Sequence, residues 1–101
     1  MARRLELQSK LEELLESENV YYNPPESKKM EYDAIRYNRK DIQSRYANDA
    51  AYSLLDCYEI TVIARIPDHP VIKKLLRLHY CSFDRSYKSE NLYHDVLTLY
   101  Y

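Results

Sequence analysis

The fold is decided by residues 80–101, which read YCSFDRSYKSENLYHDVLTLYY. Two runs rich in Tyr, Val, Leu and Phe flank a polar connector at residues 88–91, KSEN. Aromatic and β-branched side chains fit the surface of a strand, and a short polar connector between two such runs is typical of a β-hairpin. We therefore predict a hairpin at residues 80–101, and we expect it to be held in a sheet or against a partner chain.

The strongest single strand is predicted at residues 52–65. Apolar side chains recur there at every second position, at Tyr58, Ile60, Val62 and Ala64. The positions between them carry Glu59 and Thr61, with Ile63 as an apolar exception. This alternation predicts a central strand with one buried face.

Two helices are predicted from apolar side chains at helical spacing. In residues 2–17 the apolar positions are Leu7, Leu11, Leu14 and Leu15, with Glu and Lys at most of the others. The second helix is predicted to run from Asp68, which can cap its N-terminus, to about Leu78, with Pro70 tolerated in its first turn. Each helix has one apolar face for burial.

Two shorter strands complete the predicted set. Residues 20–25, VYYNPP, predict a short or edge strand, because proline cannot donate to a ladder. Residues 32–38 alternate like a strand, and a polar, bent extension through Ile42 and a turn at residues 47–50 follow. We predict an α+β fold of one domain over residues 1–101, with one mainly antiparallel sheet of about five strands. Two helices would pack on one face, in the element order α-β-β-β-α-β-β, and the other face would carry much of the tyrosine.

Composition limits the classes of protein that the chain can belong to. Its 101 residues include 12 tyrosines and no glycine, and the net charge is −1. Without glycine, left-handed backbone positions should fall to Asn or Asp. A near-neutral charge gives no electrostatic source for non-specific nucleic-acid binding. No segment predicts a signal peptide or a bilayer span, so we expect a soluble protein made in a cytoplasm, with Cys57 and Cys81 as reduced thiols.

The reactive residues do not form a recognisable active-site pattern. Cys81, His94 and Asp95 could suggest a nucleophile, a base and an orienting carboxylate. However, His94 and Asp95 are neighbours on a predicted strand and should point to opposite faces, which favours a structural role. The His and Cys residues lack the close spacings of a metal site, and a chain without glycine has no Gly-rich phosphate loop. We therefore predict no enzyme, no cofactor and no metal site.

The tyrosines leave two kinds of binding protein open. Aromatic strands could stack unpaired bases as RNA-recognition modules do, although the neutral charge and the absence of a basic, aromatic signature strand disfavour this alternative. Tyr and Arg are also enriched in the cores of protein interfaces. Such residues occur where sheet edges and loops are expected, at Arg36, Tyr37, Arg39, Arg45, Tyr46, Arg85, Tyr87 and Tyr93. We favour an interaction protein, with a single-stranded nucleic-acid-binding module as an alternative.

A family resemblance agrees with this interpretation. The segments that carry it are residues 20–25 (VYYNPP), residues 61–63 (TVI) followed by Pro67-Asp68, residues 83–87 (FDRSY), and Asn91-Leu92 with residues 94–96 (HDV). With these segments, nearly the whole chain resembles the tail terminator or tail completion proteins found in the neck of long-tailed bacteriophages. The resemblance implies a mixed α/β fold and a purely structural role in the virion, after assembly in the host cytoplasm.

The resemblance also implies partners. Such a protein would form a six-membered ring that caps the tail tube, stops polymerisation of the tube protein and contacts the head-tail connector proteins. DNA would only pass through the lumen as cargo, and no cofactor is implied. A head-tail connector or head-closure protein of the same neck is the alternative.

Copies in a closed ring meet through heterologous contacts, in which one patch touches a different patch of the next copy. We expect these contacts at residues 40–48 and 83–87. The predicted interface residues are Arg39, Arg45, Tyr46, Phe83, Arg85, Tyr87 and Tyr93.

Overall fold

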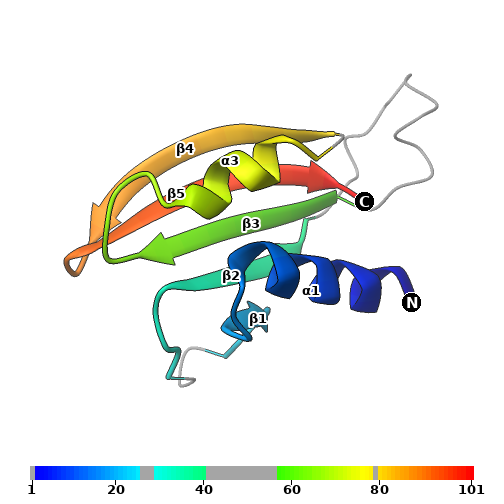
Figure 1. Cartoon of the computed structure of the whole chain (residues 1–101), viewed down its shortest axis with the longest axis horizontal. Coiled ribbons are helices and arrows are strands. Elements are labelled where there is room, and N and C mark those ends of the chain that lie inside the picture. The colour runs from blue at the N-terminus through cyan, green and yellow to red at the C-terminus, as the bar shows by residue number, and fades with distance from the viewer. Residues whose placement is uncertain (1, 26–28, 41–56, 79) are drawn as a thin grey trace.

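The computed structural model describes residues 2–25, 29–40, 57–78 and 80–101 (Figure 1). Its elements are α1 (Ala2–Leu15), β1 (Val20–Tyr22), β2 (Ala34–Arg39), β3 (Cys57–Ala64), α3 (Pro70–Leu76), β4 (Cys81–Ser89) and β5 (Leu92–Tyr100). The predicted extension through Ile42, the turn at residues 47–50, and the interface residues Arg45 and Tyr46 lie outside the described residues.

The strands form one five-stranded sheet in the order β1-β2-β3-β5-β4. β1 runs parallel to β2, and every other neighbouring pair is antiparallel, so the sheet is mixed. Because β3 and β4 both run antiparallel to β5, the connection through α3 joins two parallel strands with β5 between them. The α+β class is confirmed, while the element order and bounds match the prediction only roughly.

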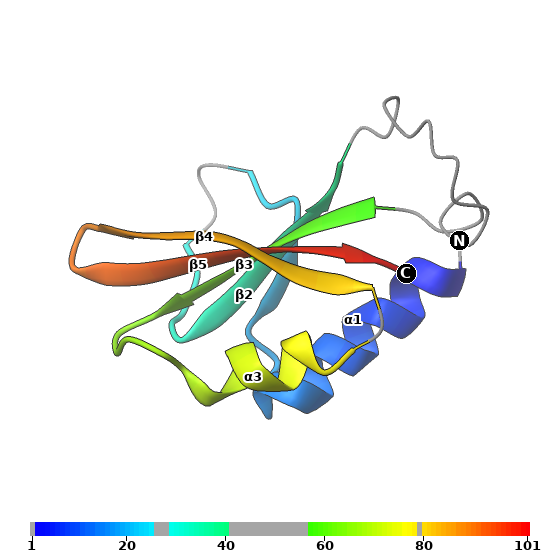
Figure 2. The same ribbon diagram turned by 90° about the horizontal axis from the view of Figure 1, so that it is seen from above.

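Both helices cover the same face of the sheet (Figures 1 and 2). Leu7 and Leu11 of α1, and Val71 and Leu75 of α3, are at most 1% exposed. They pack in one cluster with buried strand side chains that include Ile35, Tyr37, Ile60, Val62, Leu97 and Leu99. Burial of these apolar stripes on one sheet face is the main stabilising contribution to the fold.

β3 is more buried than its sequence predicted. Ile60 and Val62 face the helices and are 0% exposed, as expected for the predicted core face. On the opposite face, Thr61 is only 4% and Ile63 only 2% exposed. The expectation of a single buried face was therefore wrong. β3 lies between β2 and β5, so residues of both strands flank its second face: Arg36 and Val96 are the cross-strand neighbours of Thr61, and His94 is a neighbour of Ile63.

The start of α3 also differs from the prediction. His69, not Asp68, is the N-cap, because its Nδ1 accepts a 3.1 Å hydrogen bond from the backbone N–H of Val71. Asp68 instead takes a left-handed conformation with φ of 54°. Pro70 is the first residue of the helix, where a missing N–H costs no hydrogen bond.

Left-handed backbone positions are filled without glycine. Three of them carry Asn or Asp, as expected: Asn23, Asp68 and Asn91. Glu16, Tyr80 and Glu90 also have positive φ values, of 62°, 64° and 51°. No local pattern predicted these three positions, because their side chains do not favour that conformation.

Candidate interaction surface

The most exposed element of the described chain is strand β4. It lies at the end of the sheet, and each residue from Ser82 to Ser89 is exposed. Figures 1 and 2 show the β4–β5 hairpin extending beyond the end of β3. A long edge strand offers unpaired backbone N–H and C=O groups, which can pair with another chain.

The opposite edge of the sheet is short and shielded. β1 has only three residues, and the backbone N–H of Val20 donates to the carbonyl of Glu18 at 2.8 Å. The carbonyl of Val20 accepts a 3.1 Å hydrogen bond from Nε2 of Gln8 on α1. The chain therefore satisfies the main-chain groups of Val20 itself, whereas β4 has no described strand on its outer side.

Aromatic and charged side chains cover the hairpin. The rings of Tyr87 and His94 are stacked, with centroids 4.7 Å apart and planes at 12°. Nζ of Lys88 lies 5.1 Å from the centroid of the Tyr93 ring. These contacts join β4 to β5, and the Tyr87 side chain remains 43% exposed.

Three predicted interface residues lie on β4, but the bulge turns them to different faces of the sheet. Phe83 is 47% exposed on the helix side, opposite Leu97, whereas Arg85 and Tyr87 are exposed on the other side, opposite Val96 and His94. Nη1 of Arg85 lies 2.8 Å from Oδ2 of Asp84, an exposed pair that contributes little to stability. Tyr93 lies on β5, opposite Lys88 and on the same face as Phe83, and is half-buried.

Arg39 lies away from this group. It is exposed at the end of β2, in the cross-strand row that continues through Tyr58 and Leu99 to Cys81. That row crosses the sheet at the end opposite the hairpin turn. The structure therefore does not bring Arg39 together with Tyr87.

Tyr37 was wrongly assigned to a sheet edge or loop. It is 0% exposed and belongs to the core on β2, a strand with neighbours on both sides. Tyr80, in contrast, is 45% exposed just before β4 and was not among the predicted interface residues. Sequence alternation separates the two faces of a strand, but it does not tell an edge strand from a central one.

Cys81, His94 and Asp95 do not form a shared site. Cys81 is opposite Leu99, whereas His94 lies five residues away along β5, opposite Tyr87. Burial raises the pKa of the Cys81 thiol to about 11, so the thiolate form is disfavoured. Within the described residues, no group of three His, Cys, Asp or Glu side chains is arranged to hold a metal ion.

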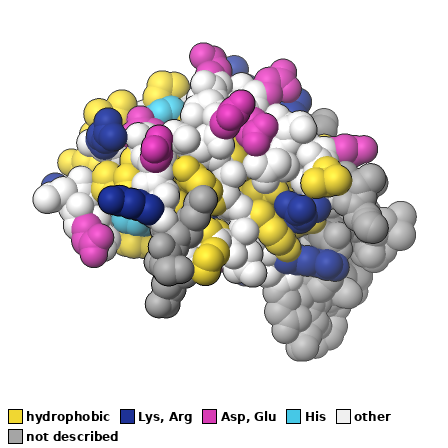
Figure 3. Space-filling view, turned by 90° about the horizontal axis from the view of Figure 1, so that it is seen from below, with side chains coloured by type: hydrophobic (Ala, Val, Ile, Leu, Met, Phe, Trp, Pro, Cys, Tyr) yellow, Lys and Arg dark blue, Asp and Glu magenta, His cyan; other side chains and the backbone are white. Residues whose placement is uncertain are grey.

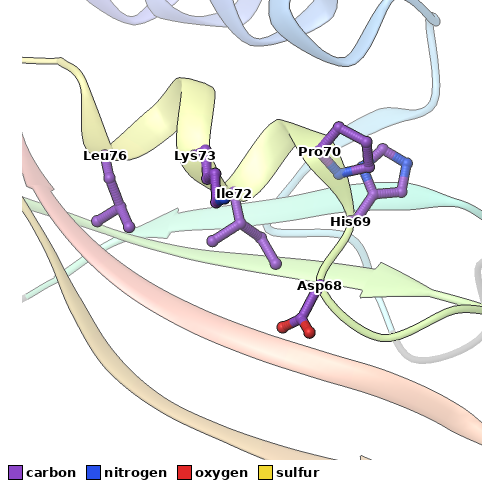
Figure 4. Close-up of a pocket in the computed structure, with 6 residues that line it drawn as sticks. All are labelled: Asp68, His69, Pro70, Ile72, Lys73 and Leu76. Carbon is purple, nitrogen blue, oxygen red and sulfur yellow. The ribbon is translucent and has the colours of Figure 1, made fainter.

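A hollow of about 630 Å³ lies beside α3 (Figure 4). Figure 4 shows Asp68, Ile72 and Leu76 pointing from α3 and its N-terminal connection toward the β4–β5 hairpin. Leu76 is 40% exposed there. The lining is mainly apolar, with the charged groups of Asp68 and Lys73 among its residues.

Charged side chains are distributed unevenly over the surface. Acidic side chains gather along one border of the surface in Figure 3. Glu6 and Glu13 of α1, and Glu16 directly after it, are exposed. On the hairpin, Arg85 and Lys88 are balanced by Asp84 and Glu90. The described residues of these two regions therefore provide no continuous basic track for a nucleic-acid backbone.

Within the described residues, no helix is long and apolar enough to cross a membrane. No family model, curated protein or solved structure matches this chain.

Proposed function

We propose that this chain is a structural protein of a long-tailed bacteriophage that assembles as a ring and caps the tail tube. The observation that carries the proposal is the exposed nine-residue edge strand β4, with Phe83 and Tyr87 nearly half exposed. Aromatic side chains of this kind are enriched in protein interfaces. The sequence resemblance to tail terminator proteins supplies the identity of the assembly.

The unlike edges of the sheet support a ring. A closed polar ring needs two different patches on each copy, because every contact is heterologous. The open β4 edge and the shielded β1 edge differ in length and in main-chain pairing. In the proposed ring, the hairpin edge contacts a different surface of the neighbouring copy through both of its faces, with Phe83 and Tyr93 on one face and Arg85 and Tyr87 on the other.

The charge distribution is compatible with DNA passing through the ring. A lumen that DNA must traverse without sticking favours a neutral or acidic lining. The chain is near neutral overall, and α1 exposes Glu6 and Glu13. The proposed partners are further copies of the chain, the tail tube protein and the head-tail connector proteins.

The proposal is tested by adding purified protein to tail tube protein during tube polymerisation. We expect rings at the tube ends and shorter, capped tubes in negative-stain images. Phe83→Asp should abolish capping, because it places a carboxylate in the proposed contact, while the monomer keeps its melting temperature. Leu5→Asp is the matched control, since Leu5 is 59% exposed on α1, away from the hairpin.

Three results would contradict this proposal or favour another function. Protein that neither forms rings nor shortens tubes would contradict it. Binding to a portal or connector but not to tubes would assign the chain to head closure. Micromolar affinity for single-stranded RNA that is lost in Tyr87→Ala would favour a nucleic-acid-binding module.

A further inference from the structure

The hairpin turn defines which backbone groups of β4 point outward. Glu90 and Asn91 connect Ser89 to its cross-strand partner Leu92, and both central residues have positive φ, of 51° and 65°. A two-residue loop with two left-handed residues is a type I′ turn. In such a hairpin the flanking residues, here Ser89 and Leu92, form a hydrogen-bonded pair.

Hydrogen-bonded and non-hydrogen-bonded pairs alternate along an antiparallel ladder. Counting from Ser89, the main-chain groups of Tyr87 and Arg85 point toward β5. Those of Ser86 and Lys88 therefore point away from β5. β4 is the last strand of the described sheet, so these outward groups lie on its open side.

A bulge limits the regular part of this edge. The register of β4 shifts between Phe83 and Arg85. Residues on the turn side of the bulge, from Arg85 to Ser89, keep an unbroken alternation against β5. A second strand can therefore continue the sheet along these five residues.

The stacked rings already follow the geometry of a continuing sheet. Tyr87 and His94 are directly opposite each other, and their 4.7 Å centroid separation equals the usual spacing of neighbouring strands, about 4.7–4.9 Å. One side of the Tyr87 ring rests on His94. The strand beyond β4 would place its own side chain on the other side, so an aromatic residue there would extend the stack.

β4 itself supplies such an aromatic residue in a compatible register. When two copies of β4 run antiparallel with Tyr87 opposite Tyr87, Ser86 of each copy faces Lys88 of the other. Both of these residues have outward main-chain groups, so two pairs of backbone hydrogen bonds can form. Arg85 then faces Ser89, and no like charges are directly opposite within the five residues.

Neighbouring registers are less favourable. A shift of two residues toward the turn places Lys88 opposite Lys88, and directly opposed like charges are destabilising. A shift of two residues the other way places Asp84, at the bulge, opposite Lys88. Within the regular residues it leaves only one pair with outward main-chain groups, Ser86 opposite Ser86. The register centred on Tyr87 is therefore the most complete.

We propose that two copies of this chain pair through residues 85–89 of β4, antiparallel, across a two-fold axis beside Tyr87. The contact joins the two sheets into one, and the stack becomes His94, Tyr87, Tyr87 of the second copy and His94 of the second copy. The partner at the open edge is therefore a second copy of the chain, because residues 85–89 of two copies match each other in this register.

This dimer goes beyond the ring proposed above and does not depend on it. A two-fold contact cannot be repeated between successive copies of a polar ring, where each contact is heterologous. Both assemblies would use the hairpin, so the dimer would have to open before the hairpin joined a ring. Self-pairing would also protect the edge from unrelated strands in the free protein.

Sedimentation analysis of the purified chain tests the pairing. An interface this small is expected to dissociate in roughly the micromolar to millimolar range. Wild type should therefore shift from monomer to dimer as its concentration rises. Ser86→Pro removes an N–H that points away from the described sheet, and it should stay monomeric with an unchanged circular dichroism spectrum. Ser86→Ala keeps the N–H and should dimerise like wild type.

A disulfide test identifies the register even if Ser86→Pro does not fold. Side chains of a directly opposed, non-hydrogen-bonded pair are about 4.5–5.5 Å apart at Cβ, close to disulfide geometry. In a Cys81→Ser background, Tyr87→Cys should give a covalent dimer with oxidised glutathione. Arg85→Cys and Ser89→Cys are the controls, since each would face a residue other than itself. Cys57 is 4% exposed and should not compete.

A wild-type chain that remains monomeric at all concentrations would overturn the dimer. Equal crosslinking of the Tyr87, Arg85 and Ser89 variants would overturn it as well. Neither result tests tail capping, which is measured separately from the length of the tail tubes in negative-stain images. Conversely, a dimer with this register in a protein that never caps tubes would leave the inference standing and contradict the proposed ring.

Discussion

The phenol of Tyr37 donates a 2.6 Å hydrogen bond to Oε1 of Gln8 at the boundary between β2 and α1. Gln8 in turn donates from Nε2 to the carbonyl of Val20, at 3.1 Å, and to Oε2 of Glu12, at 2.9 Å. One glutamine therefore ties the helix to two strands. The network also shields the β1 edge, which leaves β4 as the open edge of the sheet.

Tyr37→Phe tests the stabilising role of this network. The ring stays buried, but Oε1 of Gln8 loses its donor, so we expect the free energy of unfolding to fall by about 1–2 kcal/mol. Urea denaturation at neutral pH measures the change. Tyr87→Phe is the matched control on an exposed ring and should change stability by less than about 0.5 kcal/mol. Equal effects of the two variants would contradict a special role for Tyr37.

The hairpin and the predicted core face of β3 could be derived from the sequence, because both depend on local alternation. The helix spacing of Leu7 and Leu11 likewise predicted the buried side of α1 correctly. The second buried face of β3 could not be derived in the same way. It follows from the position of β3 in the sheet order, which is set by the connection through α3.

The interaction surface was predicted only in part, for a related reason. Phe83, Arg85 and Tyr87 share an exposed strand, as expected of interface residues. Tyr37 also lies on a tyrosine-containing predicted strand, but that strand has neighbours on both sides, and its Tyr37 side chain is in the core. Whether a tyrosine lies at an edge depends on long-range strand order, and no short-range pattern encodes that order.

The pH dependence of stability provides a test of Cys81. Burial raises the pKa of its thiol from 9.0 to about 11 in the folded chain. Because the folded state disfavours the thiolate, the stabilising contribution is complete below about pH 9 and is lost as the pH rises toward 11. Wild type should therefore lose more stability than Cys81→Ala between about pH 8 and about pH 10.

Tyr37 must be separated from Cys81 in that experiment. Burial is the largest cause that raises the pKa of the Tyr37 phenol above 10.0. Like Cys81, Tyr37 therefore makes the folded protein less stable as the pH rises. We would measure denaturation in reducing buffer for four proteins: wild type, Cys81→Ala, Tyr37→Phe and the double variant. Their comparison assigns the loss of stability at alkaline pH to the thiol or to the phenol. Identical pH profiles of wild type and Cys81→Ala would contradict the role given to the thiol.

The N-cap of α3 is His69 in the structure, whereas the sequence predicted Asp68. His69→Ala removes Nδ1, which accepts the hydrogen bond from the Val71 N–H. It also removes Nε2, which lies 3.4 Å from Oδ2 of Asp33. We expect a loss of about 1 kcal/mol in the free energy of unfolding, with recovery in His69→Asn. Asp68→Gly should be neutral or stabilising, because Asp68 has φ of 54° and is not the cap.

Thermal denaturation of these three variants decides between the two residues. If Asp68 were the cap, Asp68→Gly would cost only a few tenths of a kcal/mol, so Asp68→Ala should be measured as well. Asp68→Ala alone does not decide, because Ala is also disfavoured at the positive φ of Asp68. Loss of stability in both Asp68→Gly and Asp68→Ala, with none in His69→Ala, would show that the assignment of the cap to His69 is wrong.

A carboxylate pair near the hairpin predicts a stabilising variant. Asp68 and Asp95 line a hollow of about 130 Å³ between the β3–α3 connection and the hairpin. Burial is the main cause that raises the pKa of Asp95 above its usual value of 3.8, and the negative charge of Asp68 is the second cause. A raised pKa favours the fold below about pH 3.8, and this contribution is lost as the pH rises through the folded-state value.

Asp95→Asn should therefore stabilise the protein at neutral pH, by less than about 1 kcal/mol because the site is partly exposed to solvent. The gain should shrink as the pH falls through the raised folded-state pKa of Asp95, and it should vanish below about pH 3.8, where Asp95 is protonated in both states. Glu13→Gln is the control for a change of net charge alone, since Glu13 is exposed on α1. A gain of the same size in Glu13→Gln would contradict the local explanation.

The glycine-free hairpin turn offers the last test. Glu90 and Asn91 both adopt left-handed backbone conformations, for which Asn followed by Gly is the preferred pair in a type I′ turn. The double variant Glu90→Asn, Asn91→Gly should raise the free energy of unfolding by about 1 kcal/mol, because the side chain of Glu disfavours positive φ. Ser89→Gly, at a flanking strand residue, is the control and should destabilise, since glycine weakens strands. If the turn variant unfolds at a lower urea concentration than wild type, the hairpin has a different turn and the outward direction of Ser86 and Lys88 must be reassigned.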